Sequence, residues 1–134
     1  MNIYLDIDGV LLANERSTAA FADELLLAVL AKYPDSTYWL TTHCWHGHNR
    51  SAEVLAPFLK PETVALLAKI KPTDWNQAKT EGIDFSQPFL WFDDDLYDDE
   101  ETALKEHDTL ASHVFVDLYK NPTHLKDLVA KHFS

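Results

Sequence analysis

The chain begins with MNIYLDIDGVLL (residues 1–12), an apolar segment that runs into two carboxylates, Asp6 and Asp8, with only Ile7 between them. Residues 3–5 have the aromatic and branched apolar character of a buried strand. Because side chains alternate along an extended chain, Asp6 and Asp8 should point to the same side and Ile7 to the other. Like charges repel, and removing them from water costs further free energy. The first strand is therefore expected to end in a pair of acids that serve a function.

Further elements follow in an alternating order. Three more short runs with strand character are expected to form strands: residues 37–40, 88–92 and 113–118. Six segments between and after the strands read as helices: residues 17–32, 49–59, 61–70, 73–81, 100–110 and 122–133. Ser17, Thr73 and Asn121 are the expected N-caps. Strands that alternate with helices are typical of a mainly parallel sheet with right-handed crossovers. We therefore expect one domain over residues 1–134, a three-layer α/β/α sandwich around a Rossmann-like sheet.

Composition narrows the functional classes. The 134 residues are 46% hydrophobic and carry a formal net charge of −11, which disfavours a broad surface for the phosphate backbone of nucleic acids. No basic segment precedes an apolar run at the start, so we expect no signal peptide. No apolar run approaches the roughly 20 residues that span a bilayer, so we expect no membrane partner. Cys44 is the single cysteine, which excludes an intrachain disulfide and favours a reducing, cytoplasmic setting.

Polar residues follow three of the four expected strands. The first strand runs into Asp6 and Asp8, and the second runs into Thr41 and Thr42. The third runs directly into three consecutive aspartates: Asp93, Asp94 and Asp95. In open parallel sheets, ligands bind outside the carboxyl ends of the strands. Carboxylates gathered there are typical of a site for a hard cation with oxygen ligands, most simply Mg²⁺.

These segments, in this order, resemble the motifs of the haloacid dehalogenase-like (HAD) superfamily of phosphotransferases. DIDGV (6–10) resembles the first motif, an aspartate pair followed by a turn. YWLTT (38–42) resembles the second, an apolar strand that ends in a hydroxyl residue. A lysine before the third strand represents the third motif. LWFDDDLYD (90–98) resembles the fourth, an apolar strand followed by spaced aspartates. The first and fourth motifs are specific, whereas the second and third carry weight only in this order.

The resemblance implies a role for each matching residue. Asp6 would attack phosphorus and form an aspartyl-phosphate. Asp8 would protonate the leaving oxygen and then activate the water that hydrolyses the intermediate. Thr41 would hydrogen-bond the transferring phosphoryl group, and Mg²⁺ would be held by the Asp6 carboxylate, the Asp8 main-chain carbonyl and Asp94. The expected activity is a Mg²⁺-dependent phosphatase that acts on a phosphorylated substrate.

Two lysines compete for the third motif. Lys79 lies fourteen positions before Asp93, on a short expected helix that leads toward the third strand. Lys71 lies in a Lys-Pro step that resembles the one found in many relatives. We favour Lys79, because a short helix leaves it nearer to the end of the strand.

The neighbouring histidines and tryptophans have a less specific pattern. His43, His46 and His48 cluster in one loop, but their spacing does not define a ligand set. We expect them at the rim of a pocket, with His43 or Asn49 able to touch substrate. Trp45 and Trp75 are candidates for a pocket wall, and Cys44 is expected to be a small buried residue.

The spacing between motifs limits the size of any cap over the site. Residues 10–35 leave room for one helix, and residues 42–79 for two or three short ones. The resemblance therefore implies a member without a separate cap domain and with an open site. Such a site suits phosphate groups on large molecules, or a small substrate closed off by a second copy in a homo-oligomer. The acidic balance makes nucleic acid less attractive, although a terminal phosphate could reach in.

Three classes of function remain open from the sequence. The favoured one is the Mg²⁺-dependent phosphatase, and an end-processing phosphatase for nucleic acids is a narrower form of it. The second is a HAD-fold binding or regulatory module with little turnover. The third is an acidic, calcium-binding α/β domain, which would need neither Asp6 nor Thr41.

Overall fold

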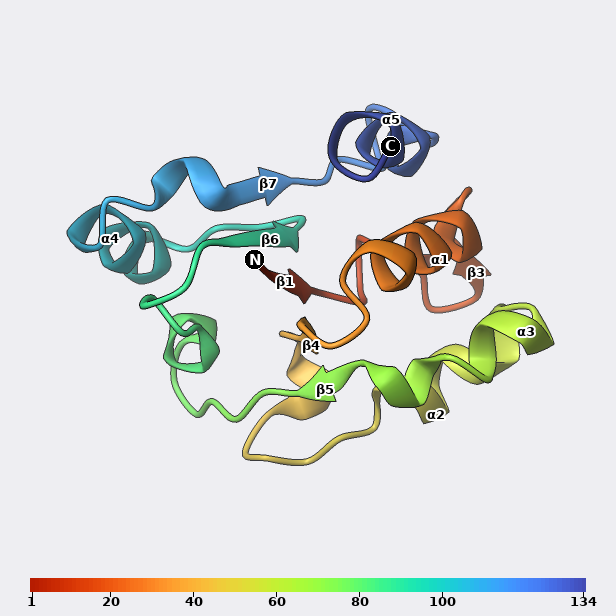
Figure 1. The fold of residues 1–134 in the computed structure, drawn as a ribbon, viewed down its shortest axis with the longest axis horizontal. Coiled ribbons are helices and arrows are strands. Elements are labelled where there is room, and N and C mark those ends of the chain that lie inside the picture. Colours follow the sequence, from red (N-terminus) through yellow and green to blue (C-terminus); the bar gives the residue numbers. More distant parts are fainter.

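The first predicted strand lies at the centre of a five-stranded parallel sheet (Figure 1). The computed structural model describes all 134 residues of the chain. The strands lie in the order β5-β4-β1-β6-β7, with these bounds: β1 (Asn2–Leu5), β4 (Thr37–Trp39), β5 (Lys71–Pro72), β6 (Phe89–Asp93) and β7 (His113–Phe115). The four predicted strands are confirmed, although β7 ends at Phe115, three residues before the predicted end. The edge strand β5 was not predicted, because only two of its residues pair with β4.

Helices cover both faces of this sheet, as Figure 1 shows. The α-helices are α1 (Ala22–Lys32), α2 (Ser51–Leu55), α3 (Pro61–Val64), α4 (Asp98–Glu106) and α5 (His124–His132). Short 3₁₀-helices join them: η1 (Thr42–Cys44), η2 (Ala56–Phe58), η3 (Leu67–Lys69), η4 (Lys79–Gly82) and η5 (Leu110–Ser112). Helices α1 and α5 lie together on one face of the sheet, and α4 lies on the other. The arrangement is an α/β fold compatible with a Rossmann-like sandwich. None of the helices combines the length and the apolar character needed to cross a membrane.

The alternation of side chains along β1 divides the core between the two faces. Ile3 and Leu5 are fully buried in the larger hydrophobic cluster, together with residues of α1 and α5. Tyr4 points the other way and packs in a second cluster that includes Leu104 of α4. Because both faces are covered, the strand is apolar throughout, as buried parallel strands usually are. The strand ends are thereby held at a fixed edge of the sheet, where the polar residues follow.

The predicted helix over residues 17–32 begins too early. Ser17 and Thr18 form β3, which pairs antiparallel with β2 (Leu12–Asn14) in a short hairpin, so Ser17 caps no helix. The Asn14 side chain accepts the main-chain N–H of Arg16 at 2.8 Å and stabilises the turn. Helix α1 starts only at Ala22. This hairpin lies beside the candidate site.

The predicted helix over residues 73–81 is reduced to the 3₁₀-helix η4. The Thr73 hydroxyl donates to the carbonyl of Trp39 at 2.6 Å, so it ties the chain to β4 and caps no helix. Instead, the Glu81 carboxylate accepts the main-chain N–H groups of three consecutive residues at 2.9–3.1 Å: Asn76, Gln77 and Ala78. This carboxylate holds the turn that presents Lys79. Asn121 is likewise not the N-cap of the last helix, which starts at His124 without a side-chain cap.

Candidate active site

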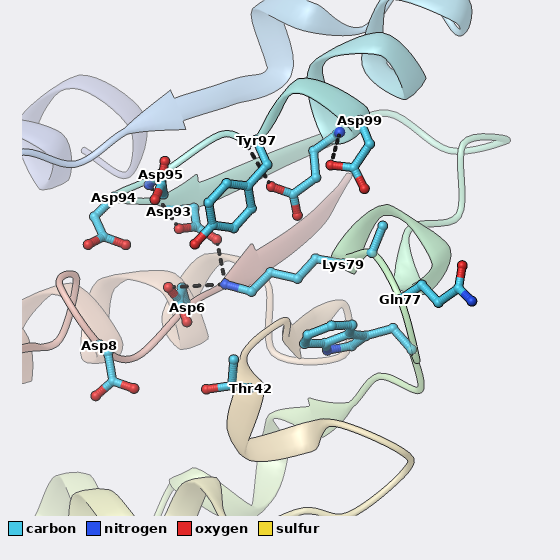
Figure 2. Close-up of a pocket in the computed structure, with 13 residues that line it drawn as sticks. Asp6, Asp8, Thr42, Gln77, Lys79, Asp93, Asp94, Asp95, Tyr97 and Asp99 are labelled. Carbon is cyan, nitrogen blue, oxygen red and sulfur yellow. Dashed lines mark hydrogen bonds and ion pairs between the residues drawn. The ribbon is translucent and has the colours of Figure 1, made fainter.

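The carboxyl ends of β1 and β6 bring three aspartates together at the centre of the sheet (Figure 2). Asp6 follows β1, Asp93 ends β6, and Asp94 comes next. One carboxylate oxygen from each of the three lies within 4.8 Å of the other two. It is the only group of three metal-ligating side chains of this kind in the chain, so the histidines of the loop after β4 form no such group.

Lys79 reaches into this cluster from η4. Its Nζ lies 2.8 Å from Asp93 Oδ2 and 3.2 Å from Asp6 Oδ2, as Figure 2 shows. Lys71 lies elsewhere: its Nζ donates to the carbonyl of Asp35 at 2.9 Å and lies over the ring of Tyr38. Of the two competing lysines, only Lys79 shares the site with the aspartates.

The charges in the cluster do not balance, and the pKa values reflect this. Burial, together with the charge of Asp93, raises the pKa of Asp6 well above its ordinary value. Burial and the neighbouring Asp93 raise the pKa of Asp94 to about 6. Burial alone would lower the pKa of Lys79, but the charges of Asp6 and Asp93 outweigh this effect. The pKa of Lys79 is therefore raised, and the lysine stays charged. One lysine thus faces three carboxyl groups, and a bound cation would offset the excess negative charge.

Gly9 lets the Asp94 carboxylate come close to the turn after β1. Its φ of 79° lies in the left-handed region that side chains rarely adopt. A Cβ at this position would overlap the carboxyl group of Asp94. A glycine is therefore required here by both the turn and the position of the third aspartate.

Asp6 and Asp8 line the same pocket, but in different surroundings. Asp6 is 5% exposed and faces Lys79, whereas the side chain of Asp8 is 62% exposed. Asp8 Oδ2 lies 3.0 Å from His43 Nε2, and this contact fixes the carboxyl group at the mouth of the site. The Asp8 carboxylate is not in the group that could hold a metal, so only its main-chain carbonyl remains a candidate ligand.

Of the two threonines at the end of β4, the structure places Thr42, and not the predicted Thr41, at the pocket. Thr41 is fully buried: its Oγ1 accepts the main-chain N–H of His43 at 3.3 Å, and its carbonyl accepts Trp75 Nε1–H at 3.1 Å. Thr42, which follows it, lines the pocket (Figure 2). The sequence places a hydroxyl residue at both positions, so the strand pattern alone could not separate them.

The pocket around these groups has a volume of about 320 Å³. Trp75 forms part of its wall, as predicted, whereas Trp45 does not line it. Cys44 is buried, also as predicted. The acidic run after β6 also contributes to the pocket, which is lined by Asp95, Tyr97, Asp99 and Glu100 but not by Asp98. Glu100 is buried and accepts the main-chain N–H of Tyr97 at 3.0 Å, so it shapes the loop instead of lying in solvent.

Comparison with protein-family models, with curated proteins and with solved structures gave no match to this chain.

The raised pKa values predict how the metal-free protein responds to pH. A carboxyl group whose pKa is higher in the folded than in the unfolded state favours folding when it is protonated. The cost of its ionisation to stability therefore grows as pH rises from the unfolded pKa to the folded pKa and is constant above it. The pKa of an aspartate in the unfolded chain is about 3.9, and the pKa of Asp94 in the folded protein is about 6. We expect thermal unfolding without metal to shift to higher temperature as pH falls from about 7.5 to 5, and Mg²⁺ to remove much of this dependence.

The contribution of Asp94 can be separated from the general effect of the net charge. Asp94→Asn should unfold at a higher temperature than the native protein at pH 7.5 and should depend less on pH. Glu106→Gln removes one exposed acid from the far end of α4 and serves as the matched control. If both variants follow the native curve in parallel, the cluster is not the source of the pH dependence.

Proposed function

We propose that this chain is a small HAD-like phosphatase without a cap domain, a Mg²⁺-dependent phosphoric monoester hydrolase that forms an aspartyl-phosphate. The observation that supports it most is the position of Lys79 between Asp6 and Asp93, with Asp94 beside them, at the carboxyl ends of adjacent strands. A nucleophilic carboxylate, a fixed cation and a further acid are the groups that phosphoryl transfer requires in one place.

The donor set fits Mg²⁺. Hard cations prefer carboxylate and carbonyl oxygens, and Asp6, Asp93 and Asp94 offer three carboxylate oxygens within 4.8 Å of one another. Asp6, Asp94 and the main-chain carbonyl of Asp8 would hold the ion, with Asp93 beside them. When bound, Mg²⁺ offsets the repulsion between these carboxylates and the phosphate and compensates the charge that spreads over the phosphoryl oxygens.

Each residue of the site has a separate role in the proposed reaction. In the first step an Asp6 oxygen forms a bond to phosphorus, and the bond from phosphorus to the leaving oxygen breaks with its electron pair on that oxygen. Asp8 supplies the proton that the leaving oxygen takes up. In the second step water attacks phosphorus, gives its proton to Asp8 and releases Asp6 and inorganic phosphate. Lys79 compensates negative charge throughout, and Thr42 takes the hydrogen-bonding role that was expected of Thr41.

Metal dependence is the experiment that tests this function. Purified protein should hydrolyse an aryl phosphate only with Mg²⁺, and an excess of EDTA should stop the reaction. Ca²⁺ should support it poorly, because its larger and looser coordination positions the phosphate badly. Hydrolysis that continues in excess EDTA would contradict the proposal. Tight Mg²⁺ binding without turnover, on a broad panel of phosphate esters, would favour the binding module instead.

A further inference from the structure

A second groove, of about 600 Å³, opens directly beside the reaction site. It lies between the β2–β3 hairpin and the α2–η2 segment, and two of its lining residues, Asp8 and Asp94, also line the pocket of the reaction site. Leu12, Val54 and Phe58 give it an apolar surface, and His43 and Asn14 add polar groups. A groove of this size and character suits a small organic molecule.

The walls of the groove are held by contacts between distant parts of the chain. The Thr18 hydroxyl donates to the carbonyl of Phe58 at 3.2 Å and ties the hairpin to η2. Val54 and Phe58 both pack against the larger hydrophobic cluster. The hairpin is also fixed at its base, where Ala19 N–H donates to the Leu11 carbonyl at 2.8 Å. The groove is therefore part of the packed structure.

The position of Asp8 relates this groove to the proposed reaction. The leaving oxygen must lie next to the group that protonates it, and the Asp8 carboxyl group is held by His43 at 3.0 Å. Both residues line the groove. An alcohol bonded to that oxygen would thus extend from Asp8 toward Val54 and Phe58.

The charges along the groove limit which alcohol can bind. No lysine or arginine lines it, and its ionisable acids are Asp8, Glu15 and Asp94. Lys79, the single cation of the adjoining pocket, is already engaged by Asp6 and Asp93. Arg50, four residues before the lining residue Val54, pairs with Glu53 at 3.0 Å. A second anionic group on the substrate would be desolvated here among like charges, without a lysine or arginine to pair with it.

We propose that this groove binds the alcohol portion of the phosphate monoester, and that it selects an uncharged alcohol with an apolar face over an anionic one. This inference rests on the proposed phosphatase function. It excludes nucleoside diphosphates, phosphorylated sugar acids and oligonucleotide ends as good substrates, because each carries further negative charge beside the reacting phosphate.

A pair of matched substrates tests the charge preference. 4-Carbamoylphenyl phosphate and 4-carboxyphenyl phosphate have the same size and differ by one negative charge. With Mg²⁺, kcat/KM should be at least about tenfold higher for the carbamoyl compound. Glu15→Lys should narrow this ratio severalfold, because it replaces an acid of the groove with a cation. Glu106→Lys makes the same change in charge at the end of α4, outside the groove, and should leave the ratio as it is.

A second variant tests where the alcohol lies. Phe58→Ala removes part of the apolar wall and should lower kcat/KM, mainly through KM, far more for phenyl phosphate than for acetyl phosphate, whose small leaving group does not reach this wall. A thermal unfolding measurement shows whether the variant is folded.

The possible outcomes separate the inference from the function on which it rests. Mg²⁺-dependent hydrolysis with equal rates on the charged and neutral substrates would overturn the inference and leave the phosphatase proposal intact. A preference for the carboxylate would overturn it as well. Absence of hydrolysis on all aryl and acyl phosphates would count against the phosphatase function itself.

Discussion

Asp6→Asn should abolish turnover, with a loss on the order of 10⁴–10⁶ for a residue that acts as the nucleophile. Asparagine keeps the size of the side chain but has no anionic oxygen to attack phosphorus. It also removes one oxygen from the group of carboxylates that would bind Mg²⁺, so the affinity for Mg²⁺ should fall as well. The native protein, denatured during turnover with a radiolabelled substrate, should carry a hydroxylamine-sensitive phosphoryl group, and the variant should carry none.

Asp8→Asn should fail in a different way, and the difference tests the division of roles. The Asp8 carboxyl group lies outside the metal-binding group and contacts His43, so Mg²⁺ should bind the variant as well as it binds the native protein. Loss of proton transfer should cost about 10²–10⁴ in rate. The cost should shrink for 4-nitrophenyl phosphate, whose leaving oxygen needs little protonation.

The comparison needs a control with the same chemical change. Asp127→Asn alters an exposed aspartate of α5 and should retain the activity of the native protein. If Asp6→Asn hydrolyses a substrate as fast as this control does, then Asp6 is not the nucleophile. Equal Mg²⁺ affinities for Asp6→Asn and Asp8→Asn would show that the Asp6 carboxylate does not hold the metal.

The central part of the site could be predicted from the sequence because it depends on local patterns. Short apolar strands that alternate with helical segments specify a parallel sheet, and such a sheet brings the ends of its strands to one edge. Asp6 and Asp94 follow two of these strands directly, and β1 and β6 are neighbours in the sheet. Their proximity thus follows from the order of the elements, without knowledge of any side-chain contact.

The errors arise where contacts between distant residues decide the structure. Thr18 binds the carbonyl of Phe58, forty positions away, and Thr73 binds that of Trp39, so both residues leave the helices that local propensity favoured. The groove beside the site depends on the first of these contacts. The choice between Thr41 and Thr42 also depends on distant contacts, since Trp75 donates to the carbonyl of the buried Thr41, whereas Thr42 lines the pocket.

Substitution of Lys79 tests the choice between two lysines, Lys79 and Lys71, that the sequence alone did not settle. On the proposed reaction its ammonium group compensates the charge of the phosphoryl group, and removing one such preorganised donor costs on the order of 10²–10³ in turnover. Lys79→Ala should show at least this loss. Lys71→Ala removes a lysine of the same formal charge that binds a carbonyl at the edge of the sheet, and it should stay within about twofold of the native protein.

Loss of activity in Lys79→Ala must be separated from loss of structure. Lys79 is mostly buried between Asp6 and Asp93, so its removal leaves two carboxylates close together without their cation. The folded pKa of Asp6, which the charge of Lys79 now lowers, should then rise further, and the variant should gain more stability than the native protein as pH falls from about 7.5 to 5. Lys79→Gln keeps hydrogen-bond donors but no charge. If it turns over substrate like the native protein, the charge of Lys79 is not needed. If Lys71→Ala is the inactive variant, the catalytic lysine is Lys71 in β5, although in this structure its Nζ donates to the main-chain carbonyl of Asp35.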